Sequence, residues 1–269
     1  MSRKPAAVFD AYVRSVELLR DKVPDFKKYP FNIPAVRHLE SLPLHPKVTF
    51  FVGENGSGKS TLVEGIAVAA GFNAEGGSRN FNFATRRSES ELHHCLRLVR
   101  GARRPKTGYF LRAESFFNVA SEIEKNDDAL VGHGGVHHHE KSHGEAFLAL
   151  VQHRFYANGL YVLDEPEAAL SPQRQLALLK HIDDLVQRKG SQLIIATHSP
   201  LVLAYPEALI YSLDGNKGLE AVAYEQTEHF ALTRDFLSNR ESYLRRLLGS
   251  PARASTTSQS TGSTSDTDS

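Results

Sequence analysis

The chain has 269 residues, 41% of them apolar, which is enough to bury the core of one large domain. Its 32 basic and 31 acidic side chains leave a net charge of +1, so no overall positive field marks it as a nucleic-acid-binding protein. Cys95 is the single cysteine, which excludes an intrachain disulfide and a cysteine cage for a metal. No apolar run approaches the roughly 18 residues that span a bilayer and no signal-peptide core follows the first residues, so we expect a cytoplasmic protein without a membrane partner.

The first part of the chain is predicted to be rich in β-structure. Residues 12–19 alternate loosely between apolar and polar side chains and predict a strand. Several prolines then punctuate the segment that leads to the apolar run 48–52, which predicts a buried strand. A helix is expected over residues 60–70, ending at Gly71, and an irregular loop over 73–87.

Short elements with a polar loop between them are expected in the middle of the chain. The apolar residues 109–111 predict a strand, and a helix is expected over 115–125. Residues 127–143 are rich in glycine and histidine and predict a loop, and 144–156 predict another helix.

Strands and helices alternate in the rest of the chain. Apolar strands are expected at 160–163 and 192–196, and later strands at 208–212 and 219–223. Between the first two lies a helix with Ser171 as its N-cap and Pro172 in its first turn, and the side chains expected on its apolar face are Leu176, Leu179, Ile182 and Val186. Short helices at 229–237 and 240–248 follow, and the tail 250–269 is predicted to be disordered because it lacks large apolar side chains. The alternation predicts an α/β architecture with a largely parallel sheet.

The strongest motif follows the strand at 48–52. Residues 53–61 fit the pattern G-x-x-x-x-G-K-[ST], with Gly53 and Gly58 at its fixed glycine positions. Such a loop wraps a polyphosphate with its backbone N–H groups, and the helix that follows presents its positive end. We expect Lys59 to reach the β- and γ-phosphates of ATP and the Ser60 hydroxyl to bind Mg²⁺. The predicted nucleotide-binding residues are Gly53, Glu54, Asn55, Gly56, Ser57, Gly58, Lys59, Ser60 and Thr61.

Two further strands end in residues that suit phosphate chemistry. The strand at 160–163 is followed by Asp164 and Glu165, and a buried strand that ends in two acids is explained by a cation at its carboxyl end. We expect Asp164 to hold Mg²⁺ and Glu165 to polarise the attacking water; a solvated turn is the alternative. The strand at 192–196 leads to His198, which we expect on a neighbouring strand end as a γ-phosphate contact.

A P-loop, an apolar strand ending in Asp-Glu-Pro and a strand ending in Thr-His-Ser, in this order, resemble the ATP-binding-cassette ATPases. That superfamily includes Rad50, SMC and RecF-like heads as well as transporter motor domains. The chain is also similar to a compact family of stand-alone ATPases, through its segments 29–34, 71–73, 111–117 and 142–145. The resemblance implies one P-loop ATPase domain over residues 1–249. Its expected parts are a mostly parallel central sheet, an N-terminal antiparallel β part and a small helical subdomain over about 113–156.

The segment Ser142-His143-Gly144-Glu145 resembles the superfamily's signature motif, with His143 in place of the usual first glycine and Glu145 in place of glutamine. In that superfamily two ATPase domains meet head to tail around ATP. The resemblance implies a homodimer on ATP binding, in which Ser142 and Gly144 contact the γ-phosphate held by the partner's P-loop.

Several assignments stay open. Glu114 is a candidate for the position of the superfamily's glutamine loop, and either Tyr29 or Phe31 is expected to stack on adenine. The histidines His133, His137, His138, His139 and His143 raise the possibility of a zinc site, but a solvated loop is the better interpretation because consecutive histidines cannot converge on one ion. The basic runs 86–87 and 100–106 are interpreted as solvated surface rather than as a phosphate-backbone contact.

The sequence therefore predicts a Mg²⁺-dependent ATPase that forms ADP and phosphate and dimerises with ATP. One alternative is a nucleic-acid-associated clamp of the repair or defence kind. Another is an ATP-binding switch for a protein partner with negligible turnover. A kinase fits less well because no acceptor site is recognisable, and residues 112–141 are too few for a long coiled-coil arm.

Overall fold

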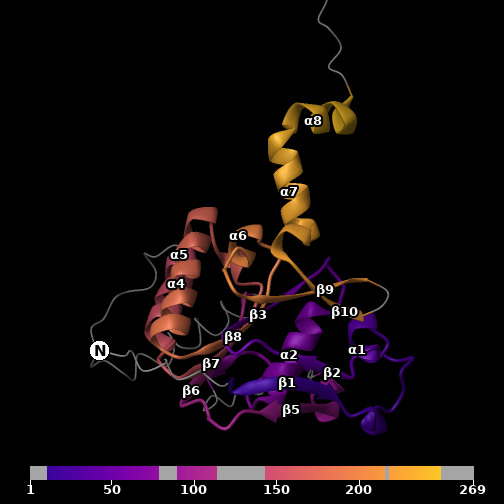
Figure 1. Ribbon diagram of the computed structural model, residues 1–269, viewed down its shortest axis with the longest axis vertical. Coiled ribbons are helices and arrows are strands. Elements are labelled where there is room, and N and C mark those ends of the chain that lie inside the picture. Colours follow the sequence, from indigo (N-terminus) through magenta and orange to yellow (C-terminus); the bar gives the residue numbers. More distant parts are fainter. Residues whose placement is uncertain (1–10, 79–89, 114–142, 216–217, 250–269) are drawn as a thin grey trace, which may run out of the picture. The chain divides into compact units, whose positions relative to one another are not determined.

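The computed structural model describes residues 11–78, 90–113, 143–215 and 218–249 (Figure 1). The chain divides into two units, Met1–Ala231 and Leu232–Ser269. The first unit holds the sheets, and the second holds the later part of helix α7 (Glu228–Ser238) and helix α8 (Arg240–Leu248). Within the described ranges, none of the helices combines the length and the apolar character that a membrane crossing requires.

The described residues form a seven-stranded main sheet in the order β10-β9-β3-β8-β7-β6-β4. The five inner strands β9, β3, β8, β7 and β6 run parallel, and the edge strands β10 and β4 pair antiparallel. The strands are β3 (Val48–Val52), β4 (Gly77–Ser78), β6 (Thr107–Arg112), β7 (Gly159–Asp164), β8 (Gln192–Ala196), β9 (Leu209–Gly215) and β10 (Gly218–Val222). The predicted α/β architecture with a largely parallel sheet is confirmed.

A second, antiparallel sheet has the order β2-β1-β5. It joins β1 (Val13–Leu18), β2 (Ser41–Pro43) and β5 (Leu96–Arg100), so the predicted N-terminal antiparallel part also recruits a strand from beyond the P-loop helix. The side chain of Gln192, at the start of β8, is fully buried and connects the two sheets. Its Nε2 donates to the carbonyl oxygens of Val13 (2.8 Å) and His45 (3.0 Å), and its Oε1 accepts from the Val13 N–H (3.0 Å).

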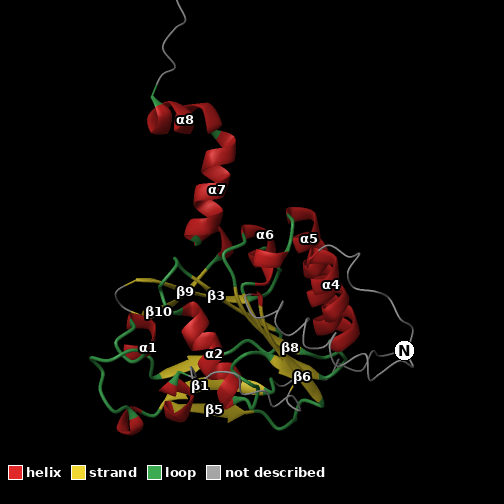
Figure 2. Ribbon diagram, turned by 180° about the vertical axis from the view of Figure 1, so that it is seen from behind, coloured by secondary structure: helices red, strands yellow, loops and turns green. Residues whose placement is uncertain are grey.

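The helices of the first unit pack on both faces of the main sheet (Figure 2). Those that lie wholly within it are α1 (Pro34–Arg37), α2 (Lys59–Ala69), α4 (His143–Arg154), α5 (Pro172–Asp183) and α6 (Pro200–Leu203). Short 3-10 turns lie at Arg20–Lys22, Glu91–Cys95, Pro166–Ala169 and Tyr224–Gln226, and a π turn at Asp184–Arg188 extends α5.

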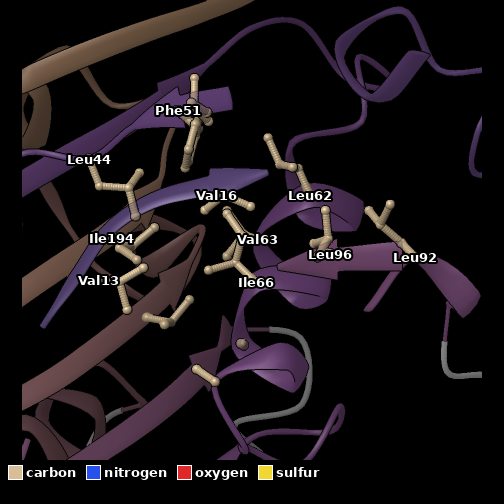
Figure 3. Close-up of a cluster of buried hydrophobic side chains, with 14 of the residues drawn as sticks. Val13, Val16, Leu44, Phe51, Leu62, Val63, Ile66, Leu92, Leu96 and Ile194 are labelled. Atoms are coloured by element: carbon tan, nitrogen blue, oxygen red, sulfur yellow. The ribbon is translucent and has the colours of Figure 1, made fainter. Parts of the chain in front are cut away.

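Alternate side chains of the inner strands feed two hydrophobic cores. Phe51 points into the core that the main sheet shares with α2 and the small sheet (Figure 3), where Leu62 and Ile66 of α2 are fully buried. Phe50 points to the opposite face, which α4 and α5 cover with buried side chains such as Phe147. Because both faces are covered, the inner strands carry mostly apolar side chains on both sides, and their charged residues lie near their ends, as expected for a parallel sheet.

The predicted apolar face of α5 is partly wrong. Leu176 is 54% exposed, whereas Leu178, Ile182, Leu185 and Val186 are buried. At about 100° per residue, Leu176 and Leu178 lie on opposite sides of the helix. Leu178 and Ile182 face the sheet, and the predicted Leu179 is partly buried against the same core. Ser171 occupies the N-cap position without a side-chain capping bond.

Other predicted boundaries shift slightly, and some lie outside the described residues. His143 already belongs to α4, although the sequence pattern places it in the preceding loop, and β4 interrupts the irregular loop expected over 73–87. The helix at 115–125, the loop 127–142 and the tail 250–269 are not among the described residues, so most of the expected 113–156 subdomain stays a prediction.

Candidate nucleotide-binding site

The three motifs meet at the carboxyl edge of the main sheet. In the register of the parallel strands, Phe51 pairs with Ala196, and Ala196 pairs with Asp164. The ladder continues past the strand ends, since the Thr197 N–H donates to the Phe51 carbonyl (3.1 Å) and the Glu165 N–H to the Ala196 carbonyl (2.9 Å). The P-loop, the acidic pair and His198 thus follow neighbouring strands, in the crevice where ligands of open α/β sheets bind.

The P-loop backbone has the conformation that its glycines allow. Gly56 and Gly58 have φ angles of 84° and 95°, which side-chain-bearing residues rarely adopt. A Cβ at Gly58 would also lie 2.5 Å from Cγ2 of Ile33, which packs directly on the loop. Helix α2 begins at the next residue, so its unpaired N–H groups face the loop.

Lys59 is buried at 3% exposure and is held by its own loop. Its Nζ donates to the carbonyl oxygens of Gly53 (2.7 Å) and Glu54 (2.9 Å). Burial lowers the pKa of Lys59, and nearby carboxylates, chiefly those of Glu165 and Asp164 and also those of Asp214 and Glu167, oppose that shift. Acids from two strand ends, those of β7 and β9, therefore act on one ammonium group.

Asp214, near the end of β9, is a site residue that the sequence did not reveal. Its Oδ1 accepts from the Glu54 N–H at 2.6 Å, and its Oδ2 accepts from the Ser212 hydroxyl at 3.0 Å. This contact ties the first turn of the P-loop to the neighbouring strand. Asp214 lies in a predicted turn, where an acidic residue is common, so the sequence did not indicate that it contacts the P-loop.

The acidic pair has two distinct environments. Asp164 is 5% exposed, and its Oδ2 lies 3.6 Å from Nε of Arg112, whose Nη1 donates to Glu64 of α2 (2.7 Å). Glu165 is half-buried in a left-handed conformation (φ 51°), and its Oε1 lies 2.9 Å from Nε2 of His198. Arg112 supplies the positive charge that a buried carboxylate requires. This role of Arg112 was not identified from the sequence.

The donor set fits a magnesium ion that shares its ligands with a nucleotide. Ser60 offers a hydroxyl and Asp164 a carboxylate, and Mg²⁺ is typically held by one or two such oxygens together with phosphates and water. No group of three or more histidine, cysteine, aspartate or glutamate side chains in the described ranges could hold a metal by itself. The histidines at 133 and 137–139, considered for zinc, lie outside those ranges.

The loop that carries His198 is fixed by side chains from the preceding motif. The backbone N–H groups of His198 and Ser199 both donate to Oε1 of Glu167, the second at 3.2 Å. The Ser199 hydroxyl donates to Gln175 (2.6 Å) and accepts from the first N–H groups of α6. Glu167 is therefore a further supporting residue that the sequence did not identify.

The two candidate aromatics differ sharply in exposure. Phe31 is 1% exposed and belongs to the core beneath α2. Tyr29 is 67% exposed, and its hydroxyl lies 2.9 Å from Oγ1 of Thr61, the last residue of the P-loop motif. Of the two, only Tyr29 can meet a ligand without unfolding the core.

Of the predicted signature residues, the structure describes only part. Gly144 is buried in the first turn of α4, where a Cβ would lie 2.8 Å from Cδ of Arg174. The same Arg174 donates to Glu145 at 2.9 Å. Ser142 and Glu114 lie outside the described residues.

Two family models match separate parts of the chain. Residues 25–128 match a family model described as an AAA domain. Residues 145–204 match one described as an AAA domain, putative AbiEii toxin, Type IV TA system. Both descriptions name an AAA domain, in agreement with the P-loop motif at residues 53–61. A search of curated proteins found no match.

Several solved structures resemble the chain in fold. The SMC head domain from Thermotoga maritima is 16% identical, with a TM-score of 0.40, and the likeness covers 68% of this chain and 93% of that one. CbiO1 from Clostridium perfringens, part of the ABC transporter complex cbiONQ, is 18% identical, with a TM-score of 0.46 over 88% of this chain and 100% of that one. A putative metal-chelate type ABC transporter in an inward-facing conformation is 16% identical, with a TM-score of 0.42 over 82% and 87%.

Proposed function

We propose that the protein binds ATP together with Mg²⁺, hydrolyses it to ADP and phosphate, and forms a head-to-tail homodimer when ATP is bound. The observation that carries this proposal is the convergence of Lys59, Asp164, Glu165 and His198 at one edge of the sheet. Phosphoryl transfer needs positioning and charge stabilisation more than covalent chemistry, and these side chains supply both.

The P-loop residues 53–61 bind the phosphates in this proposal. The Lys59 ammonium exchanges its two carbonyl acceptors, Gly53 and Glu54, for phosphate oxygens, which are stronger acceptors because they are charged. Ser60 and Asp164 hold Mg²⁺, which neutralises charge on the phosphates when it is bound. Arg112 remains beside Asp164, so the buried carboxylate keeps a positively charged neighbour.

Glu165 acts as the general base in this proposal. It accepts a proton from the water that attacks the γ-phosphorus, the bond from that phosphorus to the bridging oxygen breaks, and ADP leaves. His198 donates a hydrogen bond to the γ-phosphate. His198 and Glu165 contact each other, so both are close to where the reaction would take place.

Tyr29 is the residue that we assign to the base of the nucleotide. It is exposed beside the end of the P-loop motif, and an aromatic ring offers a face on which adenine can stack. Ser142 and Gly144 complete the site of the partner protomer. A hydroxyl at a helix N-terminus is a natural ligand for a phosphate.

The proposal is tested by comparing wild type with Glu165→Gln. We expect ATP and Mg²⁺ to trap the variant as a dimer in light scattering while phosphate release falls by about a hundredfold or more, because glutamine keeps the shape of the site but cannot accept the proton. Lys59→Ala should abolish both dimer formation and turnover. Lys47→Ala serves as the control, since that lysine lies near Glu207 at the amino end of β3.

Three results separate the alternatives. Unchanged turnover in Glu165→Gln or in Lys59→Ala would overturn the assigned site. ATP-dependent dimerisation without measurable turnover in the wild type would indicate a binding switch. Strong stimulation of turnover by duplex DNA that disappears at high salt would indicate a nucleic-acid clamp.

A further inference from the structure

A second histidine continues the contact between Glu165 and His198. Nδ1 of His198 lies 3.0 Å from Nε2 of His229, the second residue of α7, while Nε2 of His198 lies 2.9 Å from the Glu165 carboxylate. The two imidazole rings are 5.1 Å apart and tilted by 56°. His229 lies 31 residues beyond His198 and outside every motif of the sequence.

The chemistry of Glu165 determines which atom donates in the two hydrogen bonds that His198 makes, one to Glu165 and one to His229. An ionised carboxylate only accepts, so Nε2 of His198 donates to Glu165. In a neutral His198 the other nitrogen, Nδ1, is then an acceptor, and Nε2 of His229 must donate to it. That leaves Nδ1 of His229 without a proton.

The surroundings of His229 favour donation from His229 to His198 over donation from His198 to His229. Its Nδ1 is buried and has no hydrogen-bond partner among the described residues. If His198 donated through both nitrogens, Nε2 of His229 would accept and Nδ1 would carry a buried N–H without an acceptor, which is rarer in proteins than an acceptor without a donor. Burial, the largest influence, lowers the pKa of His229, which favours its neutral form.

We propose that His229 is a positioning residue that holds His198 in the tautomer with its proton on Nε2, ready to donate to a γ-phosphate. The inference rests on the proposed function, because it assigns His198 to that phosphate. Glu165 and the γ-phosphate then compete for one N–H group, so the arrival of ATP releases Glu165 for the attacking water.

Backbone and side-chain anchors keep His229 in place. The Thr227 hydroxyl donates to the Tyr224 carbonyl at 2.7 Å, and the Tyr224 hydroxyl donates to the Pro200 carbonyl at 2.9 Å. Pro200 begins α6 directly after the loop of His198. The segment that carries His229 is thus bonded to the segment that carries His198, which is what a positioning role requires.

The first test reads the tautomer directly by ¹⁵N NMR of histidine-labelled protein without nucleotide. The His198 signals are assigned by their loss in His198→Gln. We expect Nε2 of His198 to be protonated in wild type and in His229→Gln, whose amide N–H lies near the place of the original Nε2. A mixture of tautomers is expected in His229→Leu. An unchanged His198 pattern in His229→Leu would overturn the proposal.

The second test measures ATP turnover in the same variants. We expect kcat to fall by about tenfold or more in His229→Leu with little change in KM, because a histidine in the wrong tautomer loses its donor. His229→Gln should restore most of the rate, and His153→Gln, an exposed histidine on α4, should match wild type. Equal losses in His229→Leu and His229→Gln would show that packing rather than the donor matters, and would overturn the inference.

The two tests separate this inference from the proposed function. If wild type shows no ATP turnover, the proposed hydrolysis fails, yet the NMR result still decides whether His229 sets the tautomer. If wild type turns over and His229→Leu keeps the full rate while folded, the inference fails and the ATPase proposal stands.

Discussion

Single residues at the candidate site hold conformations or charges that would be costly elsewhere in the protein. Lys59 is a buried ammonium, Glu165 has a left-handed backbone, and Gly58 combines a positive φ with a close neighbour. Such features persist where the surrounding structure determines them, and they gather at functional sites. At this scale the site is most sensitive to changes of backbone shape.

Gly58→Ala is predicted to disable the P-loop. The alanine Cβ would meet Ile33 at 2.5 Å, and φ of 95° disfavours any side chain. Gly71→Ala is the matched control, because Gly71 has the same φ of 95° but nothing within 4 Å of a Cβ. We expect both variants to lose about 1 kcal/mol of unfolding free energy from the backbone, and Gly58→Ala to lose more.

Denaturant unfolding and binding of a fluorescent ATP analogue measure the two effects. Gly58→Ala should bind the analogue at least about tenfold more weakly, and Gly71→Ala should bind it normally. Equal affinities in the two variants would show that the close contact with Ile33 is unimportant.

At the scale of elements, the two sheets depend on a few polar side chains at strand ends. Gln192 connects β8 to β1 and to the segment before β3, and all three of its bonds are to backbone groups. His45 holds the start of β3, since its Nδ1 lies 3.3 Å from the backbone N–H groups of Lys47 and Val48. The strand that leads into the P-loop is therefore fixed at the end opposite to the site.

Gln192→Leu is predicted to lower the free energy of unfolding by about 3 kcal/mol or more. Leucine fills much of the space but leaves the buried Val13 N–H and two carbonyl oxygens without partners, and each such group costs about 1–3 kcal/mol. Gln173→Leu, at an exposed position of α5, is the control and should change stability by less than about 0.5 kcal/mol. Chemical denaturation compares the two, and a loss in Gln192→Leu as small as in the control would refute this role.

His45 is predicted to make stability fall in mild acid. Burial, followed by the charge of Lys47, lowers the pKa of His45. In the unfolded chain, where the pKa of a histidine is about 6.5, His45 binds a proton more readily than in the folded chain. The free energy of unfolding therefore decreases as the pH falls below that value. His45→Asn keeps an acceptor at the place of Nδ1 but does not titrate, so its stability should depend less on pH between 7 and 5.

Denaturant unfolding at several pH values provides the measurement. Some dependence should remain in His45→Asn, because burial also lowers the pKa values of His181 and His229. Identical pH profiles for wild type and His45→Asn would contradict the assignment to His45.

At the scale of the whole molecule, the proposed site needs two copies of the chain. The P-loop and the acidic pair lie at the carboxyl edge of the sheet, and Gly144 lies in the first turn of α4, which covers one face of the same sheet. A head-to-tail dimer would give each ATP one P-loop and the partner's signature segment. In such a dimer, the two parts of each ATP site come from different protomers.

Mixing two inactive variants is predicted to restore activity. Lys59→Ala lacks a working P-loop and forms no dimer by itself, and the homodimer of Ser142→Ala lacks the signature hydroxyl at both of its sites. In the mixed dimer one site combines the intact P-loop of one protomer with the intact signature of the other. We expect phosphate release to rise on mixing well above the average of the separate variants, and a simple average would exclude shared sites.

Much of the fold was predictable because the inner strands are buried on both faces and are therefore rich in apolar residues. The prediction for β3 and that for β8 match the structure residue for residue, and the helix after the P-loop is displaced by one residue. The apolar face of α5 was predicted less well, because Leu176 is apolar but exposed. Strand β5 was missed because its alternating arginines and apolar residues lie in a short, half-exposed strand.

The sequence by itself determined the chemistry that we propose for the site, because a P-loop, an acidic strand end and a histidine strand end are local patterns that the chain carries in order. Only the tertiary structure decided which other side chains join them. Arg112, Glu167, Asp214 and His229 come from separate elements and carry no local pattern, so their roles arise from the parallel register that brings distant strand ends together. The choice of Tyr29 over Phe31 was likewise a matter of burial, which depends on how the chain packs rather than on which residues it contains.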